Sequence, residues 1–178
     1  MVWNDGSIFE GNWRNDMANG KGRLIHANGN FYEGDWVDDK AEGEGVYTYE
    51  NGSKYIGAFK GDKQEGQGKE EWADGSTFEG EYVAGRKEGQ GKFTWADGSE
   101  YEGNFSNGKT EGEGVKTWPD GKRYEGEWKD GKMHGQGTFD WPKSKFYEGQ
   151  WEHGKKHGYG KLTWEDGRIY AGQWKCGK

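Results

Sequence analysis

The stretch WADGSEYEGNF, at residues 95–105, decides the fold, because near copies of it return along the chain. WADGSTFEGEY occupies residues 72–82, and WPDGKRYEGEW occupies residues 118–128. Each copy contains an aromatic residue, a tight-turn signal, a second aromatic residue, a glycine and a third aromatic residue. A fixed spacing of this kind indicates a repeat architecture, in which one small structural unit stacks on the next.

The interval between copies is 23 residues along the whole chain. The aromatic residues that open the Y/F-x-G triplets are Phe9, Tyr32, Tyr55, Phe78, Tyr101, Tyr124, Tyr147 and Tyr170. A second aromatic residue follows four positions later, and a G-x-G pair begins eleven positions later. Seventeen positions later a third aromatic residue follows in every complete repeat except the first, where His26 takes its place. We therefore predict one domain over residues 1–178, with seven complete repeats and partial units at both ends.

The composition favours a thin structure built on rings. Only 29% of the residues are hydrophobic and 32% are charged, yet 16% are aromatic and 35 are glycine. Low hydrophobicity with high charge is typical of disordered chains, but such chains contain few aromatic residues. The net charge of −7 argues against nucleic acid as a partner. The single cysteine, Cys176, excludes an internal disulfide and fits a reducing compartment.

The glycine density excludes helices, because each glycine inside a helix costs about 1 kcal/mol relative to alanine. Alternation over short segments predicts strands instead, such as GKFTW at residues 91–95 and YEGNF at residues 101–105. An isolated hairpin is marginally stable in water, so hairpins must stack. The predicted fold is all-β: an elongated, twisted, single-layer antiparallel sheet of consecutive β-hairpins.

The turn in residues 118–122, WPDGK, sets the register of these hairpins. Proline suits the first central position of a type I turn, and the glycine suits the left-handed position of a G1 bulge. This three-residue loop places Trp118 opposite Lys122 and Lys116 opposite Tyr124. In every repeat it brings the rings to one face, here called the ring face, and charged residues to the other face. The predicted charge pairs are Lys92 with Glu102, Lys69 with Glu79, and Arg23 with Glu33.

Residues 124–147, YEGEWKDGKMHGQGTFDWPKSKFY, closely resemble the pattern of MORN repeats (membrane occupation and recognition nexus), and the resemblance covers essentially the whole chain. It implies an array of β-hairpins with an aromatic-lined concave side. It also implies a module for protein interaction, dimerisation or membrane targeting, as in phosphatidylinositol-phosphate kinases, junctophilins and radial-spoke proteins. The implied location is the cytoplasm, in association with the cytoskeleton, a cilium or a membrane face.

The chain departs from the family pattern at several positions. The histidine of the family's HG pair is present only at His134 and His157, and the residues that replace it are Asn19, Glu42, Glu65, Glu88 and Glu111. Glu70 and Lys116 stand where an aromatic or aliphatic residue is usual on the ring face. Ser144 replaces the turn glycine, so the turn at residues 141–145 is expected to have a different shape.

Catalysis, cofactors and metals are not expected. The EGxG segments look like phosphate-binding loops, but those motifs need a strand followed by a helix. His153 and His157 have a spacing that serves metals on helices rather than in glycine-rich connections. Paired carboxylates such as Glu70 and Glu71 need a desolvated pocket for acid–base chemistry, which a single layer does not offer. We therefore expect a non-catalytic scaffold or adaptor.

The ring face is the predicted binding surface for a helix or extended peptide of a partner protein, because no second layer covers it. The predicted groove residues are Tyr82, Trp95, Phe105, Trp118, Trp128, Glu70 and Lys116. Glu70 and Lys116 either set the polarity of a partner or lean their stems over neighbouring rings.

Membrane targeting through anionic phospholipid is the main alternative. A basic residue recurs eight positions after each opening aromatic residue from Tyr32 to Tyr147, and in the last repeats no acidic residue accompanies it. The predicted lipid contacts are Lys132, Lys155 and Lys156. A third alternative is a regulatory segment of a larger enzyme, such as a phosphatidylinositol-phosphate kinase. The chain opens and closes within a repeat, so both sheet edges are expected to be open and to pair with a second copy or a subunit of a larger assembly.

Overall fold

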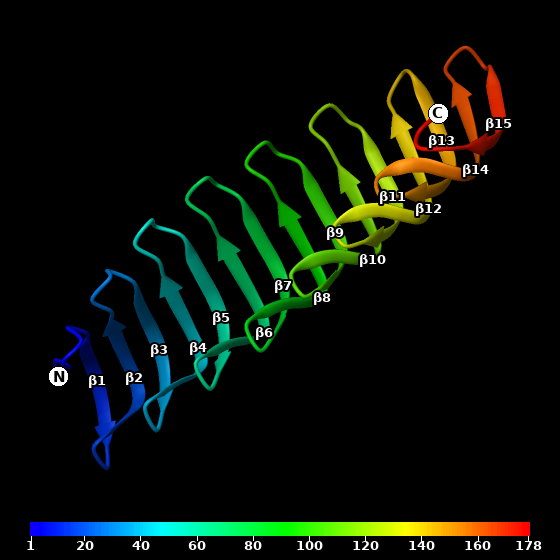
Figure 1. Ribbon diagram of the computed structural model, residues 1–178. Helices are drawn as coiled ribbons and strands as arrows, with labels where there is room; N and C mark the ends of the chain where they lie inside the picture. Colours follow the sequence, from blue (N-terminus) through cyan, green and yellow to red (C-terminus); the bar gives the residue numbers. More distant parts are fainter. The chain divides into compact units, whose positions relative to one another are not determined.

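The computed structural model describes residues 1–178 as fifteen strands, hydrogen-bonded to one another in chain order in one antiparallel sheet (Figure 1). The strands are β1 (Ile8–Arg14), β2 (Met17–Ile25), β3 (Phe31–Val37), β4 (Lys40–Thr48), β5 (Lys54–Lys60), β6 (Lys63–Glu71), β7 (Thr77–Val83), β8 (Arg86–Thr94), β9 (Glu100–Ser106), β10 (Lys109–Thr117), β11 (Arg123–Lys129), β12 (Lys132–Trp141), β13 (Lys145–Glu152), β14 (Lys155–Trp164) and β15 (Ile169–Trp174). The prediction of an all-β, single-layer sheet of consecutive hairpins is confirmed.

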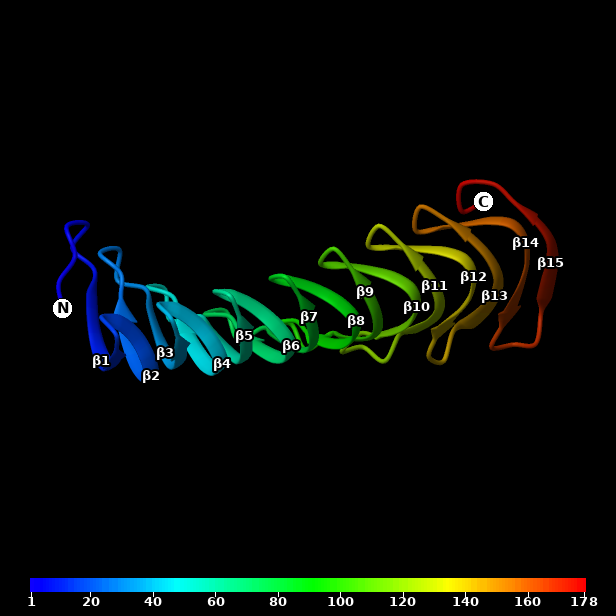
Figure 2. The ribbon, with the colours of Figure 1, turned by 90° about the horizontal axis from the view of Figure 1, so that it is seen from below.

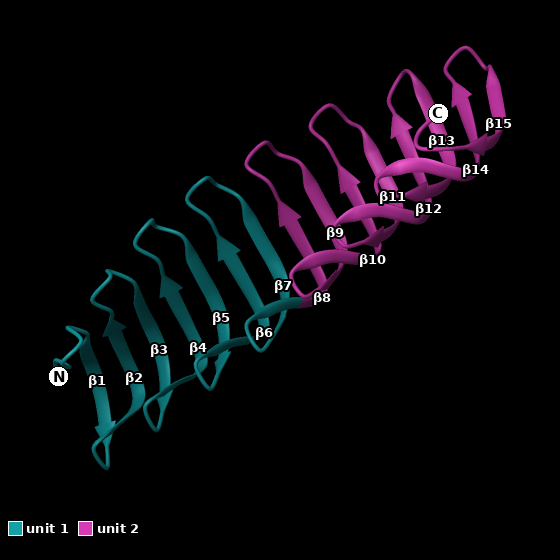
Figure 3. Cartoon of the chain, viewed as in Figure 1, with its two compact units in different colours: residues 1–87 teal, residues 88–178 magenta.

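The chain divides into two compact units, Met1–Lys87 and Glu88–Lys178 (Figure 3). Within the second unit the strands are bowed, as Figure 2 shows. The assignment of residues 1–178 to a single domain stays a prediction.

The turn that follows the third aromatic residue of a repeat, seventeen positions after the opening one, is the predicted three-residue loop. The backbone N–H of Trp118 donates to the Lys122 carbonyl at 2.9 Å, and Gly121 has φ of 84°. A left-handed φ of this kind is available to glycine at little steric cost, which explains why the turn contains glycine. The Asp97 carboxylate, in the same loop of the preceding repeat, accepts a hydrogen bond from the Ser99 N–H at 2.8 Å. That backbone hydrogen bond holds the pKa of Asp97 below its usual value.

The turn at residues 141–145 has a different shape, as predicted. The left-handed residue is Lys143, with φ of 54°, and Ser144 has no positive φ. The Ser144 N–H donates to the Trp141 carbonyl at 3.0 Å, and Trp141 pairs directly with Lys145. Strands β12 and β13 therefore meet closer to their turn than the strands of other repeats.

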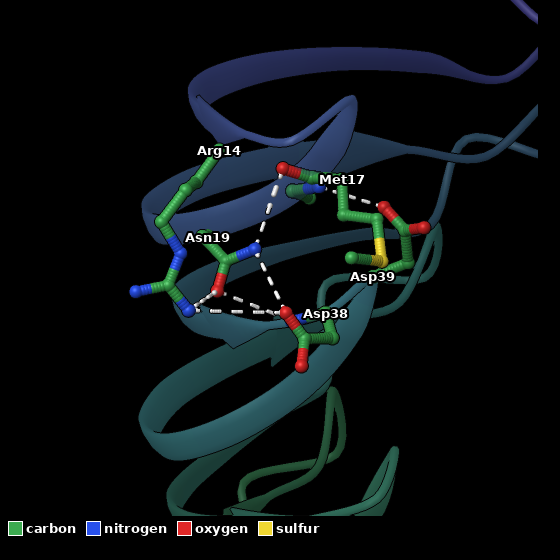
Figure 4. Close-up of polar contacts among 6 residues, drawn as sticks. Arg14, Met17, Asn19, Asp38 and Asp39 are labelled. Atoms are coloured by element: carbon green, nitrogen blue, oxygen red, sulfur yellow. Dashed lines mark hydrogen bonds and ion pairs between the residues drawn. The ribbon is translucent and has the colours of Figure 1, made fainter.

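The second turn of each repeat has two residues, both with positive φ, such as Asp38 (46°) and Asp39 (67°). This is the type I′ geometry, whose twist matches that of the flanking strands. Side chains link consecutive turns of this kind (Figure 4). The Asp39 carboxylate accepts a hydrogen bond from the Ala18 N–H at 2.7 Å, and the Asn19 amide donates to Asp38 at 3.2 Å.

The register agrees with the sequence prediction. Lys92 lies opposite Glu102, Lys69 opposite Glu79, and Arg23 opposite Glu33. The ion pairs, however, form with other carboxylates: Lys92 with Glu100 at 3.1 Å and Lys69 with Glu71 at 2.7 Å. Because lysine is long and flexible, a diagonal or same-strand neighbour lies within reach as easily as the residue directly opposite.

The core of each unit is a row of rings on the ring face, here called the inner row. It consists of the opening aromatic residues and the aromatic residues four positions later. Tyr101 is fully buried and packs edge-to-face against Phe105 and Trp128, with ring centroids 5.2 Å apart in both pairs. Edge-to-face packing suits the ring quadrupoles. Each ring therefore touches one ring of its own repeat and one of the next, which joins the repeats.

The glycines of each strand make room for these rings. A Cβ on Gly103 would lie 2.6 Å from the Glu113 carbonyl oxygen and 2.8 Å from the Tyr101 hydroxyl. That hydroxyl donates to the Asn104 carbonyl at 2.9 Å, which fixes the ring over bare backbone. The glycines between the aromatic residues are therefore part of the core.

The first residues of the chain fold back on the free edge of β1. The Met1 ammonium donates to the Phe9 carbonyl at 2.8 Å, and the Phe9 N–H donates to the Met1 carbonyl at 2.9 Å. Val2 and Ile8 form an isolated bridge. The edge predicted to be open is therefore partly paired at the N-terminus, while β15 pairs with β14 alone.

Candidate functional site

The aromatic residues beside the three-residue loops form a second, less buried line on the ring face, here called the outer row. Its members are Tyr49 and Trp72 in residues 1–87, and Trp95, Trp118, Trp141 and Trp164 in residues 88–178. Tyr49 is 38% exposed and the five tryptophans are half-buried. The inner-row rings of the central repeats, such as Tyr55 and Tyr124, are fully buried, whereas Trp13 and Tyr170 in the terminal repeats are 40% and 43% exposed. In the central repeats the outer row is therefore more accessible to solvent than the inner row.

In residues 88–178 three members of the outer row, Trp95, Trp118 and Trp141, belong to one stack. The Trp118 and Phe139 ring centroids lie 5.2 Å apart and those of Phe139 and Trp141 lie 4.0 Å apart, with nearly parallel planes. The Lys116 ammonium lies 3.9 Å from the Trp95 ring centroid and 5.2 Å from that of Trp118. A cation therefore occupies, between Trp95 and Trp118, the place that Phe139 occupies in the next repeat.

The structure separates the predicted groove residues into two groups. Tyr82, Phe105 and Trp128 belong to the inner row and are only 1%, 5% and 7% exposed. Trp95 and Trp118 belong to the outer row and are half-buried. All five face the same side of the sheet, as predicted, but only Trp95 and Trp118 are appreciably accessible to solvent.

Glu70 and Lys116, which the sequence singled out, have different surroundings. Glu70 forms an ion pair with Lys87, and the two side chains are only 14% and 18% exposed. The Lys87 ammonium also lies 5.0 Å from the ring centroids of Trp72 and Phe78. The sequence analysis did not single out Lys87. It could have been found from the repeat alignment, because Ala18 and Ala41 occupy the same place in earlier repeats and a long cationic side chain replaces them here.

Lys116 has no carboxylate within ion-pair distance. Burial between the two indoles lowers the pKa of its ammonium, and the more distant Asp97 offsets this only in part. The ammonium is held against the ring faces by cation–π attraction. The structure thus shows Lys116 leaning over its neighbouring rings; its role toward a partner stays a prediction.

The comparisons with known proteins agree with this geometry. The MORN repeat family model matches residues 9–31, 32–54, 55–77, 78–100, 101–123, 124–145 and 147–167. The chain belongs to the MORN repeat family. A comparison with curated protein sequences found no match.

A comparison with solved structures found several that are similar to this MORN array. The TCP domain of SAS-4 (dCPAP) from Drosophila melanogaster, in complex with a proline-rich motif of Ana2 (dSTIL), has a TM-score of 0.54 and 11% identity, over 94% of this chain and 90% of that chain. The G-box domain of CPAP has a TM-score of 0.40 and 17% identity, over 98% of this chain and 97% of that chain. The TCP10 domain of Danio rerio CPAP has a TM-score of 0.34 and 14% identity, over 97% and 92% of the two chains.

The acids that replace the MORN histidine stabilise the turns. Each accepts a hydrogen bond from a backbone N–H in the type I′ turn of the next repeat, at 2.8–2.9 Å. The pairs are Glu42 with Gly61, Glu65 with Ala84, Glu88 with Asn107, and Glu111 with Asp130. Asn19 accepts from the Asp38 N–H in the same way, at 3.3 Å. These acids therefore cap turns of the MORN array.

The three lysines predicted to contact lipid differ in exposure, and their contact with lipid stays a prediction. Lys132 and Lys155 are exposed at the starts of β12 and β14. Lys156 is half-buried on the ring face, with its ammonium 4.3 Å from the Trp174 ring centroid. The chain contains no helix with the length and apolar character needed to cross a membrane.

The histidines of the C-terminal repeats make contacts with one another and with an acid. The His134 and His153 rings lie 6.1 Å apart, and His157 lies 3.3 Å from Glu152. No group of three or more histidine, cysteine or acidic side chains is arranged to hold a metal ion. A hollow of about 420 Å³ lies on the face opposite the rings. Its lining includes Lys92 and Glu100, which form an ion pair, and other polar residues.

Proposed function

We propose that this chain is a non-catalytic scaffold or adaptor module that binds a helix or an extended segment of a partner protein on its ring face. The observation that carries the proposal is the outer row of half-buried indoles, which no second layer of either unit covers. Contiguous exposed aromatic surface marks binding sites, and tryptophan is enriched among the residues that dominate binding energy.

The contact residues in this proposal are Trp95, Trp118 and Lys116, all in residues 88–178, while a role for Glu70 in binding stays a separate prediction. The buried rings of Tyr82, Phe105 and Trp128 form the floor that holds the outer row in place. The SAS-4 TCP domain, which shares the fold, is in complex with a proline-rich motif, and this supports a peptide segment as the class of partner.

Selection from a random peptide library on the purified chain tests the proposal. We expect peptides to be enriched on the wild-type chain and to be lost on a Trp95→Ala/Trp118→Ala double variant whose β-sheet circular dichroism is unchanged. Phe146→Ala is a matched control, because this residue is 40% exposed and lies outside the ring face. Failure of every library to yield a peptide that depends on Trp95 and Trp118 would contradict the proposal.

Anionic membrane is the alternative ligand, since indoles beside lysines are typical of interfacial contact with lipid. Co-sedimentation with phosphatidylserine vesicles at several salt concentrations tests it. Binding that falls with salt and with charge reversal at Lys132, Lys155 and Lys156 favours lipid. Pairing with a second copy or a larger assembly, a role as a regulatory segment of a larger enzyme, and a cytoplasmic, cytoskeletal or ciliary location stay predictions.

A further inference from the structure

The indole N–H groups of the two aromatic rows differ in what they bind. In the inner row, Trp128, Trp151 and Trp174 each donate to a glycine carbonyl of the preceding repeat at 3.1 Å. In the outer row, the indoles of Trp118 and Trp141 have no acceptor within the chain. The outer row of residues 88–178 therefore presents a series of free donors, one for each repeat.

The spacing of these donors selects the conformation of a chain that lies along them. Two strands make one repeat and adjacent strands lie about 4.8 Å apart, so successive donors lie about 9.6 Å apart. A polyproline II helix rises about 3.1 Å per residue with three residues per turn, so the same side returns every ~9.3 Å. Its carbonyls make no internal hydrogen bonds and are free to accept.

Other conformations do not match this spacing. An α-helix covers the interval in about 6.4 residues, which is not a whole number of turns, and its carbonyls are already bonded. A β-strand covers it in about three residues, but its side chains alternate, so successive repeats would meet opposite sides. Only the polyproline II helix presents one side, with free carbonyls, to every tryptophan in turn.

The charge of the ring face indicates the second property of the ligand. In residues 1–87 the buried ammonium of Lys87 is paired with Glu70. In residues 88–178 the ammonium of Lys116 lies against Trp95, and that of Lys156 lies 5.6 Å from Trp141, with no carboxylate within ion-pair distance of either. Burial lowers the pKa of both lysines, so each has already lost hydration that a carboxylate would replace.

From these observations we infer that the outer row of residues 88–178 binds an acidic, proline-rich segment in the polyproline II conformation, with its residues in register with Trp95, Trp118 and Trp141 every three positions. Carboxylates of the segment pair with Lys116 and Lys156. Trp95 and Trp141 are two repeats apart, so the paired carboxylates are about six residues apart on one side of the helix. The inference rests on the proposed protein-binding function and names the class of its ligand.

Fluorescence anisotropy with labelled synthetic peptides and the full chain tests this inference. The probe is a peptide of about five Pro-Pro-Asp triplets, long enough to span the row. We expect saturable binding that weakens at least about tenfold when the prolines become alanines, when a fourth proline breaks the triplet spacing, or when lysine replaces aspartate. If the peptide with alanines, or the peptide with a four-residue repeat, binds as tightly as the Pro-Pro-Asp peptide, the inferred polyproline II conformation is wrong.

Two variants separate the contributions. Trp118→Phe keeps the ring but removes the donor, and it is expected to weaken binding about threefold to tenfold. Lys116→Gln is expected to weaken binding of the aspartate peptide but not of a Pro-Pro-Gln peptide. Lys109→Gln on the same strand, an exposed lysine paired with Asp130, is the matched control and should change neither affinity.

The result also distinguishes this inference from the proposed function. If library selection yields peptides that depend on Trp95 and Trp118 but lack acidic proline triplets, the inference is wrong and the proposed function stands. If no peptide binds and phosphatidylserine vesicles do, both are wrong.

Discussion

At the scale of single residues, each glycine of the ring face is determined by the ring that lies over it. The hydroxyl of Tyr101 donates to the Asn104 carbonyl, and its ring covers Gly103 and Gly114. Tyr101 cannot move away, because it is fully buried between Phe105 and Trp128. A methyl group added at such a glycine therefore acts directly on the core.

Alanine at Gly114 is expected to destabilise the protein by about 3 kcal/mol, because its Cβ would lie 2.6 Å from a carbon of the Tyr101 ring. Gly131→Ala is the matched control: Gly131 has φ of 79° and open space around it, so only the left-handed backbone costs energy, about 1 kcal/mol. Urea denaturation followed by circular dichroism measures both. Equal losses for the two variants would show that the ring does not occupy this position.

The buried phenols make stability depend on alkaline pH. Burial raises the pKa of Tyr55 and Tyr147 to about 12, and it raises those of Tyr82, Tyr101 and Tyr124 as well. Below about pH 10 these phenols are protonated in both states, so their contribution to stability is fully present. Above about pH 10 the unfolded phenols ionise while the folded ones do not, so stability is lost as pH rises toward 12.

We therefore expect the urea midpoint to fall between about pH 10 and about pH 12. Tyr55→Phe, which cannot ionise, should show a shallower fall, although it also loses a hydrogen bond to the Ala58 carbonyl. A midpoint that stays constant over this range would contradict the burial of the phenols.

At the scale of strands, β6 and β8 are joined on the ring face by an ion pair that is surrounded by aromatic rings. Glu70 of β6 and Lys87 of β8 form an ion pair that is less than one-fifth exposed at either side chain. Burying an ion pair costs hydration that the attraction between its members only partly repays. Such a pair contributes little to stability when intact but is costly to break.

A double-mutant cycle on this pair tests that argument. Lys87→Met leaves the Glu70 carboxylate unpaired against rings and is expected to cost about 2 kcal/mol. Glu70→Phe combined with Lys87→Met restores the apolar pattern of the other repeats and is expected to match or exceed wild-type stability. A double variant clearly less stable than the wild type would show that the intact pair stabilises the sheet more than apolar side chains do.

At the scale of the whole molecule, every strand pairs only with its neighbours in the chain. The stability of such an array is close to a sum of the repeats and their nearest-neighbour contacts. The two units also differ in the charge of the ring face, since Lys87 is neutralised by Glu70 whereas Lys116 and Lys156 are not paired. We therefore expect ligand preference to be a property of particular repeats rather than of the array.

Deletion of one repeat, residues 101–123, tests this modular organisation. The deletion joins residue 100 to Tyr124, which occupies the same place in its repeat as Tyr101, so the register is kept. We expect a folded β-sheet with a lower thermal midpoint, followed by circular dichroism. Deletion of half a repeat, residues 101–112, removes one strand, places the remaining strands out of phase and should prevent folding of this region.

The sequence by itself determined the repeat, the all-β sheet, the turn with its left-handed glycine, and the register that brings all rings to one face. These features depend on contacts within a few residues of a turn, and local chemistry settles them. The sequence also placed Trp95, Trp118, Glu70 and Lys116 on the ring face correctly; their role in binding stays a prediction.

Only the tertiary structure decided which rings are core and which are accessible. Trp128 and Trp118 look alike in the sequence, but Trp128 is closed in by Tyr101 and Tyr124, whereas Trp118 lies at the sheet margin. The pairing of Lys87 with Glu70 and the capping of turns by the acids of each preceding repeat were likewise decided there. The ion pair and the turn caps join residues 17 and 19 positions apart in neighbouring repeats, and residues so far apart in the chain come into contact only when the hairpins stack.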